Sequence, residues 1–233
     1  RAAAGDAATA ITATDRSPTS AAVTVTTAAG TFRVGGMAKG AGMIEPHMAT
    51  MLGFVTTDAA VPAPMLQRAL RDAVDVTFNA ITIDGDTSTN DTVFLLASGA
   101  SGVRIDDAMY PAFAAALREV CGSLARAIVR GGEGATKLVA VSASGAASDA
   151  DATRAAHTIA NSLLVKTAIH GGDPNWGRLL AAAGRAGVAF DVERATVRIG
   201  PVVLFKDGVP FDDRAPEAAA YLAGTDLEIE IGL

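Results

Sequence analysis

Residues 35–60 read GGMAKGAGMIEPHMATMLGFVTTDAA, and this stretch decides how the rest of the chain is interpreted. Its first half contains four glycines and one lysine, whereas residues 51–57 form an apolar run with the length of a buried strand. Glycine permits positive φ and close backbone approach, so a tight loop can precede this strand. The stretch therefore predicts a shaped loop that leads directly into a strand.

Thr50 lies where the loop meets the strand, directly after Ala49. Its hydroxyl can reach the carbonyl of Ala49 by closing a five-membered ring, and an N-to-O acyl shift followed by hydrolysis would cut the chain there. The freed α-amine, with an ordinary pKa of ~7.7 to 8.0, would then be a general base for its own hydroxyl. Ala-Thr pairs are common, however, so spacing alone favours an ordinary threonine.

Four motifs, in this order along the chain, resemble the ornithine acetyltransferases, which are the glutamate N-acetyltransferases of arginine biosynthesis. They are residues 39–59 (KGAGMIEPHMATMLGFVTTDA), 83–92 (IDGDTSTNDT), 131–137 (GGEGATK) and 171–178 (GGDPNWGR). Four motifs of this length are hard to obtain by chance. The resemblance covers nearly the whole chain.

The resemblance implies an acetyl transfer from N-acetylornithine to glutamate. The mechanism is ping-pong through an acetyl-Thr50 ester, after autoproteolysis between Ala49 and Thr50. It implies no metal and no resident cofactor, with acetyl-CoA as an optional co-substrate, and an α2β2 heterotetramer of upstream and downstream chains. The family's oxyanion-stabilising Thr-Gly pair and its last substrate contacts, an Asn and a Ser/Thr, have no counterpart here. We therefore expect a chain that is shorter than the family at both ends.

In addition to the nucleophile Thr50, the resemblance assigns substrate-binding roles to individual residues of this chain. Lys39 is expected to pair its ammonium with a substrate carboxylate, and Glu133 to face an α-ammonium. Residues 10–15 (AITATD) resemble the family's A-I-x-T-T-D stretch, and Ala13 replaces the first threonine, so Thr14 is carried over as a substrate-binding residue. A solvated lysine and a polar loop glutamate are the ordinary alternatives.

The acidic turn after residue 83 invites a metal-site interpretation. Asp84, Asp86, Asn90 and Asp91 lack the spacing and terminal glutamate of a calcium loop, and such turns usually hydrogen-bond their own backbone. We therefore expect a structural turn near the site. His47 is close enough to Thr50 in sequence to suggest a base, but a terminal amine fills that role, so a loop histidine is expected.

Composition narrows the class of protein. The chain has 233 residues, a net charge of −6 and one cysteine, Cys121, which falls on the apolar face of a predicted helix and is expected to be a packed thiol. Without a basic cluster, we expect no nucleic-acid partner. No run approaches the ~20 apolar residues of a membrane span, and residues 1–10 lack a secretory signal pattern. We therefore expect a cytoplasmic enzyme without a membrane partner.

Periodicity predicts an α/β protein. Strands are expected at 22–27, 31–34, 51–57, 81–83, 92–97, 136–142, 195–199, 202–205 and 226–231, and helices at 64–78, 110–128, 148–161, 173–184 and 216–222. The resemblance implies a layered αββα sandwich of the self-cleaving N-terminal-nucleophile type, with a smaller C-terminal α/β domain. We expect the catalytic domain at 1–134, containing the end of the upstream chain (1–49) and the start of the downstream chain (from 50), and the second domain at 135–233.

Two other functions remain open at this point. One is an N-terminal-nucleophile aminopeptidase of the related self-cleaving fold, which would release amino acids from peptides. The other is an inactive fragment or structural paralogue, which would persist as a single chain.

Overall fold

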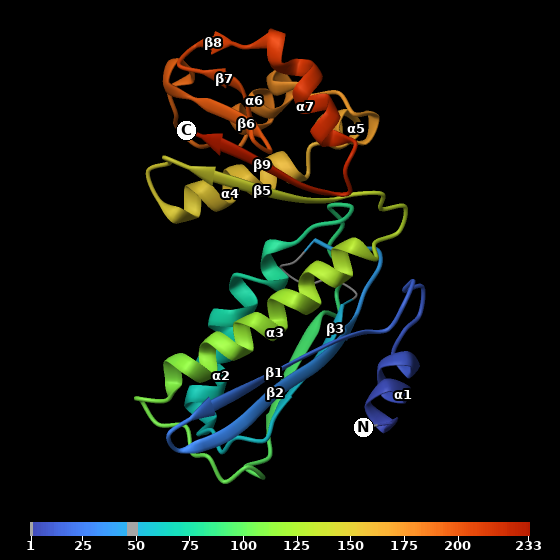
Figure 1. Ribbon diagram of the computed structural model, residues 1–233, viewed down its shortest axis with the longest axis vertical. Helices are drawn as coiled ribbons and strands as arrows, with labels where there is room; N and C mark the ends of the chain where they lie inside the picture. The colour runs from blue at the N-terminus through green and yellow to red at the C-terminus, as the bar shows by residue number, and fades with distance from the viewer. Residues whose placement is uncertain (1, 46–50) are drawn as a thin grey trace. The chain divides into compact units, whose positions relative to one another are not determined.

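The computed structural model describes residues 2–45 and 51–233, so Ala49, Thr50 and His47 lie outside the described residues. The chain divides into two compact units, residues 1–135 and 136–233. Each unit has its own sheet and its own helices (Figure 1). The predicted α/β class is therefore confirmed.

The sheet of unit 1 has four strands that lie side by side in chain order. They are β1 (Thr19–Thr27), β2 (Gly30–Lys39), β3 (Leu52–Thr57) and β4 (Thr92–Ala97). β1 and β2 contain the strands predicted at 22–27 and 31–34, and they form a hairpin that turns at Gly30 with a φ of 125°, which glycine adopts readily. β3 pairs antiparallel with β2 and parallel with β4, so β3 and β4 begin at the same end of the sheet.

The helices of unit 1 are α1 (Ala2–Ala10), α2 (Ala63–Asp75) and α3 (Tyr110–Arg130), with a 3-10 turn, η1 (Phe78–Ala80), after α2. α3 lies across β1 and β2, and α2 packs beside it (Figure 1). Phe113, Leu117, Val120 and Leu124 of α3 recur at helical spacing and are fully buried, as the sequence predicts.

One glycine allows α3 to lie close to the sheet. A Cβ on Gly36 of β2 would lie 2.9 Å from the carbonyl oxygen of Phe54 and 3.2 Å from Leu124 Cδ1. On the opposite face of the sheet, Phe94 and Leu96 of β4 are 49% and 56% exposed. Within residues 2–45 and 51–135, the described structure thus has one sheet with α2 and α3 on one face. The four-layer αββα arrangement stays a proposal.

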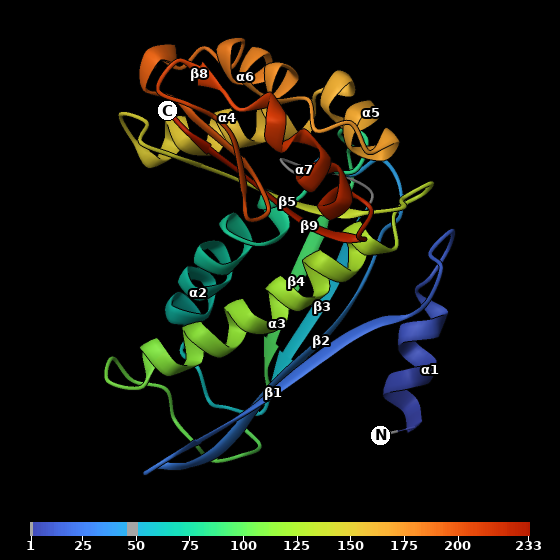
Figure 2. The same cartoon turned by 45° about the horizontal axis from the view of Figure 1, so that its top comes forward.

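Unit 2 is built on a five-stranded sheet in the order β5-β9-β6-β7-β8. The strands are β5 (Leu138–Ser144), β6 (Thr196–Ile199), β7 (Val202–Lys206), β8 (Val209–Pro210) and β9 (Asp226–Gly232). The helices are α4 (Asp149–Ala160), α5 (Leu163–Gly171), α6 (Trp176–Gly184) and α7 (Ala215–Leu222). Two 3-10 turns, η2 (Val192–Arg194) and η3 (Asp212–Arg214), lie between them. β5 and β9 are parallel, and the other pairs are antiparallel. α4 packs on β5 and against α6, as Figure 2 shows.

The core of unit 2 follows from alternation along its strands. Leu227, Ile229 and Ile231 of β9 are buried, whereas Glu228 and Glu230 between them point away from the core. In the described ranges, no helix is long and apolar enough to cross a membrane.

Three sequence predictions need correction. Residues 81–83 are not a strand, and the N–H of Ile83 donates to the carbonyl of Ile44 (2.8 Å). The helix predicted at 173–184 begins later, at Trp176, and Asn175 is its N-cap. Residues 2–10 and 163–171 form helices that the sequence analysis did not predict.

Candidate active site

The segment that contains Thr14 is fastened to the loop that follows Lys39. Asp15 accepts hydrogen bonds from the backbone N–H of Gly40 (2.5 Å, at Oδ1) and from that of Ala13 (3.0 Å, at Oδ2). Gly40 directly follows Lys39, which ends β2. One carboxylate thus places Thr14 and Lys39 in the same neighbourhood.

Glu133 reaches the same loop from the end of α3. Its backbone N–H donates to the carbonyl of Ala41 (2.7 Å). A Cβ placed on Gly42 would lie 3.2 to 3.5 Å from the carboxylate atoms of Glu133, so the glycine leaves room for this side chain. The carboxylate of Glu133 therefore lies over the glycine-rich loop.

The described structure brings together three of the sequence-predicted site residues. Thr14 and Glu133 are exposed, and Lys39 is half-buried, so all three can meet a ligand from solvent. An ammonium and a carboxylate around one loop match the two charged groups of an amino acid. Thr50 and Ala49 lie outside the described residues, although Met51, which follows them, is buried at 4% exposure.

Asp15 is a residue of this site that the sequence analysis quoted but did not select. The feature that could have indicated Asp15 is its position at the end of the AITATD stretch, next to Thr14. Its role became visible only because Gly40, 25 residues away, supplies the amide that it binds.

The acidic turn lies in unit 1 and is engaged with backbone amides. Asp84 accepts a hydrogen bond from the N–H of Asp86 (3.1 Å), the local turn geometry that was expected. Among the residues that the structure describes, no three His, Cys, Asp or Glu side chains are grouped so as to hold a metal ion.

Lys137 ends the GGEGATK motif and has a different role from Glu133. Its Nζ donates to the carbonyl of Ile169 (2.7 Å) near the end of α5 and to the carbonyl of Leu222 (2.5 Å) at the end of α7. A lysine at a helix C-terminus satisfies carbonyls that lack intrahelical partners. Lys137 therefore holds two helices of unit 2 together.

The side chains of residues 171–178 are used to fix α6. Asn175 Oδ1 accepts from the N–H of Arg178 (3.1 Å), and the Trp176 ring stacks on Phe205 with centroids 4.9 Å apart. Trp176 also donates its indole N–H to Asp212 (3.0 Å). The polar and aromatic side chains of this motif therefore stabilise the start of α6 and its packing in unit 2.

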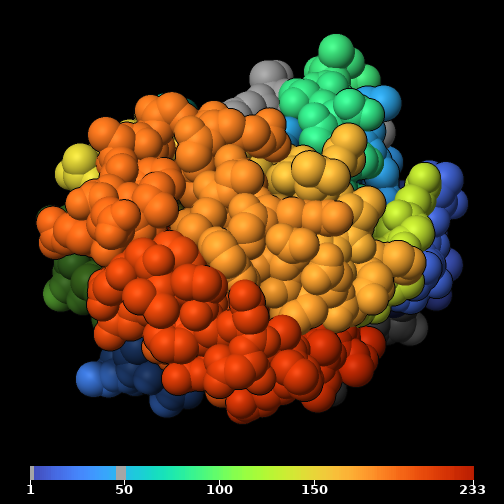
Figure 3. Space-filling view, turned by 90° about the horizontal axis from the view of Figure 1, so that it is seen from above, coloured from blue at the N-terminus to red at the C-terminus, as the bar shows by residue number. Residues whose placement is uncertain are grey.

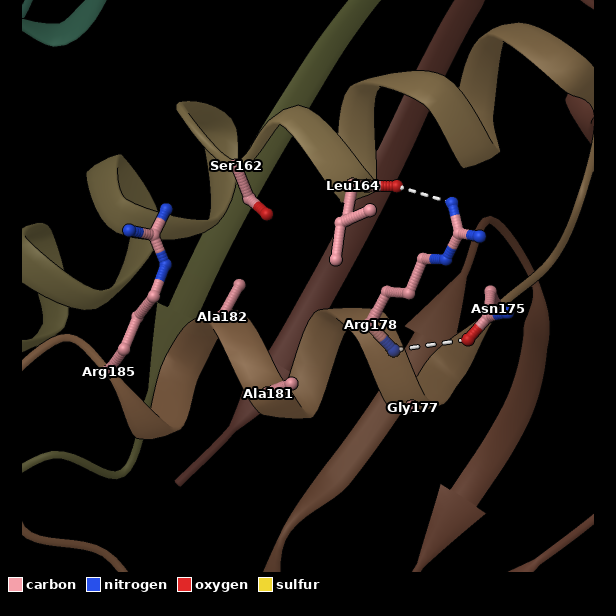
Figure 4. Close-up of a pocket in the computed structure, with 8 residues that line it drawn as sticks. All are labelled: Ser162, Leu164, Asn175, Gly177, Arg178, Ala181, Ala182 and Arg185. Atoms are coloured by element: carbon pink, nitrogen blue, oxygen red, sulfur yellow. Dashed lines mark hydrogen bonds between the residues drawn. The ribbon is translucent and has the colours of Figure 1, made fainter.

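A groove of about 270 Å³ lies between α5 and α6, on the part of unit 2 seen in light orange and orange in Figure 3. Figure 4 shows Arg178 reaching from α6 to the carbonyl of Leu164 on α5, a bond of 2.9 Å. Arg178 also donates to Thr167 (3.2 Å). The groove contains none of the sequence-predicted site residues, and its central arginine bridges two helices.

Cys121 is fully buried in the core of unit 1, on the sheet-facing side of α3. Burial raises the pKa of its thiol from 9.0 to about 12. The prediction of a packed thiol is confirmed, because a thiol that stays protonated is a poor nucleophile.

Comparison with known proteins gives a consistent result along the chain. The model of the ArgJ family matches residues 1–233. "Arginine biosynthesis bifunctional protein ArgJ" of Symbiobacterium thermophilum is 51% identical over 215 residues, which cover 90% of this chain and 54% of that protein. "Glutamate N-acetyltransferase" of Methanocaldococcus jannaschii is 50% identical over 238 residues, covering 98% of this chain and 59% of that protein. This chain thus spans about half the length of the curated relatives that it matches.

A solved structure supports the same relationship. The crystal structure of arginine biosynthesis bifunctional protein argJ from Bacillus halodurans superimposes with a TM-score of 0.76 at 44% identity. The match covers 79% of this chain and 88% of that one.

Proposed function

This chain belongs to the ArgJ family, and from that premise we propose that it is part of a glutamate N-acetyltransferase of arginine biosynthesis, which moves an acetyl group from N-acetylornithine to glutamate. One observation in particular supports the proposal. The N–H of Gly40 donates to Asp15 and the N–H of Glu133 donates to the carbonyl of Ala41, and these two hydrogen bonds gather the carried-over substrate residues around the loop that leads toward Thr50.

The first step of the proposed mechanism is self-cleavage. The Thr50 hydroxyl attacks the carbonyl carbon of Ala49, the C–N bond between the two residues breaks, and the hydroxyl proton passes to the departing nitrogen. Water then hydrolyses the resulting ester, leaving a carboxylate on Ala49 and a free amine and hydroxyl on Thr50. The amine is the general base for the next step.

The second step is acetyl transfer in two halves. The Thr50 hydroxyl attacks the acetyl carbonyl of N-acetylornithine, and ornithine leaves with the proton. The neutral α-amine of glutamate then attacks the acetyl-Thr50 ester, which restores the hydroxyl. Lys39 pairs with a substrate carboxylate, Glu133 faces a substrate ammonium, and Thr14 offers a hydroxyl as a hydrogen-bond partner.

The proposal includes the finer fold and the assembly. Residues 1–134 form the catalytic domain of an αββα sandwich, with a second sheet on the face of β4 that carries Phe94 and Leu96, and residues 135–233 form the smaller domain. The upstream chain ending at 49 and the downstream chain beginning at 50 pair as α2β2. The chemistry requires no metal or resident cofactor.

The test uses the full-length protein that contains this chain. With acetyl-labelled N-acetylornithine and no glutamate, the label should appear on the peptide that begins at Thr50, and intact mass should show two fragments. Thr50→Ala should abolish both results. Thr56→Ala, an exposed threonine on β3, is the matched control and should leave them unchanged. An uncleaved wild-type protein, or label on no peptide beginning at residue 50, would refute the proposal.

The same preparation separates the alternatives. Release of free amino acids from peptides, without acetyl transfer to glutamate, would favour the aminopeptidase. Acetyl-CoA should be assayed as a second donor, because several relatives carry the name bifunctional.

A further inference from the structure

Asp84 binds the chain just before the segment that contains Thr50. Its Oδ2 accepts from the backbone N–H of Met43 (2.6 Å), and its Oδ1 accepts from that of Ile44 (3.0 Å). Met43 adopts a positive φ of 56°, which is uncommon for a residue other than glycine, so the chain bends where the carboxylate binds it. This carboxylate fixes a bend some forty residues away in sequence.

Other residues of the same turn hold the same stretch. Thr87 donates its hydroxyl to the carbonyl of Glu45 (3.2 Å), and Ile83 donates its backbone N–H to the carbonyl of Ile44 (2.8 Å). The last described residues before position 46 are therefore anchored at three consecutive positions.

Asp91, at the far end of the turn, binds the chain just after Thr50. Its Oδ1 accepts a hydrogen bond from the backbone N–H of Met51. The carbonyl of Met51 accepts from the N–H of Thr92 (3.1 Å), so both backbone groups of Met51 are bound next to the first pair of the β3–β4 ladder, Leu52 and Thr92. Met51 is also buried, so its backbone is held by packing as well.

The bond between Asp91 and Met51 has a consequence for the neighbouring residue. The nitrogen of Met51 belongs to the peptide group whose carbonyl is that of Thr50, and a peptide group is planar. The Asp91 carboxylate therefore holds the N–H of Met51, the first described residue after the cleavage segment. Hydrogen bonds to charged acceptors are stronger than those between neutral groups.

We propose that Asp84 and Asp91 are positioning residues for self-cleavage at Thr50, acting as a clamp on the two sides of the cleavage segment. The inference rests on the proposed function. Self-attack requires the reacting atoms to be held close together and aligned, and an anchor on each flank restricts the conformations that the intervening residues sample. Neither aspartate is assigned a contact with substrate or with the reacting atoms.

The test measures the rate of cleavage in the full-length precursor, made by cell-free synthesis and followed by gel and intact mass. Asp84→Ala and Asp91→Ala should each slow cleavage by about tenfold to a hundredfold, the loss expected for a hydrogen bond to a charged acceptor. Asp91→Asn keeps an acceptor oxygen at the same position and should restore part of the rate.

Asp58 offers a matched control in the same sheet. It follows β3 at the opposite end, and its Oδ1 accepts from the backbone N–H of Arg33 (2.7 Å), so it makes the same type of bond. Asp58→Ala should lower the melting temperature as much as the clamp variants do, yet leave the cleavage rate within twofold of wild type. A role in stability alone would slow all three variants equally and would overturn the proposal.

The outcomes separate this inference from the function on which it rests. If the wild type is cleaved after Ala49 and both alanine variants are cleaved within twofold of its rate, the clamp is wrong and the function stands. If the wild type is not cleaved, the function itself fails. If the alanine variants do not fold, Asp84→Asn and Asp91→Asn decide: slowing by about threefold or more supports the clamp, and an unchanged rate overturns it.

Discussion

The turn at residues 83–92 and the segment at residues 171–178 both belong to motifs that resemble one family, yet their polar side chains do different work. In the first, carboxylates bind backbone amides of a separate loop, those of Met43, Ile44 and Met51. In the second, Asn175 and Trp176 bind α6 and the nearby core of unit 2. The contacts of the first motif therefore reach backbone amides about forty residues away in sequence, whereas those of the second stay within unit 2.

The packing role of residues 171–178 is tested most strongly by Trp176→Ala, which should give the largest loss of stability. The variant loses the stack on Phe205 and the bond to Asp212, so the free energy of unfolding of unit 2 should fall by about 3 kcal/mol. Circular dichroism in urea measures this loss. Tryptophan fluorescence cannot follow the variant, because Trp176 is the only tryptophan of the chain. Val209→Ala removes a half-exposed side chain and should change stability by less than about 0.5 kcal/mol. If the two variants were equally stable, the packing role would be wrong.

Cys121 lies in the core of unit 1. Its accessibility therefore shows whether the loss of stability caused by Trp176→Ala is confined to unit 2. Its thiol has a pKa of about 12 in the folded unit and 9.0 as its ordinary value. Below pH 9 it is protonated in both states and adds no pH dependence, whereas stability falls as the pH rises from 9 toward 12, because the unfolded state loses its proton first. At pH 8, the rate at which a thiol reagent labels Cys121 therefore reports unfolding of unit 1. Trp176→Ala should leave this rate unchanged.

A smaller effect is expected from Lys137→Met. The change keeps the length of the side chain but removes the hydrogen bonds to Ile169 and Leu222, so unit 2 should lose about 2 kcal/mol. Lys206→Met, at the exposed end of β7, is the control. Tryptophan fluorescence in urea measures both. Equal midpoints would show that Lys137 does not hold the two helices, and would leave it open to a functional role like the one proposed for Glu133.

The smallest effect is expected from Asn175→Ala, which removes the N-cap of α6. The loss should be about 1 kcal/mol, and Asn175→Ser should recover part of it, because a hydroxyl oxygen can accept the same N–H bond without placing a second carboxylate beside Asp173, to which Asn175 Nδ2 donates (3.1 Å). Thermal unfolding of the three proteins measures the difference. A Ser variant as unstable as the Ala variant would mean that the bond from Asn175 Nδ2 to Asp173, rather than the N-cap, provides the stability, and the comparison between the two segments would weaken.

Much of the fold could be predicted from local pattern. The alternation in residues 22–27 and the helical spacing from Phe113 to Leu124 predict elements that the structure contains. The helix predicted at 148–161 is present as α4, and Ser148 caps it, since its side chain accepts from the N–H of Asp151. These signals depend on neighbouring residues, so a single sequence contains them.

The errors have an equally local cause. Residues 81–83 are apolar enough for a strand, but their backbone follows the bend at Ile44 instead of pairing in the sheet. Asp173 and Asn175 are both good caps, and only the observed start of α6 at Trp176 chooses between them. α5 was missed because an apolar run of this length does not distinguish a helix from a strand.

The sequence by itself determined the class of fold, the order of most elements and, through four motifs, the family and its candidate residues Thr14, Lys39 and Glu133. Only the tertiary structure decided which backbone amides Asp15, Asp84 and Asp91 bind, across separations of 25 to 41 residues. The physical reason is that a backbone N–H is nearly the same at every position, so the partner of a carboxylate is chosen by where the folded chain places it.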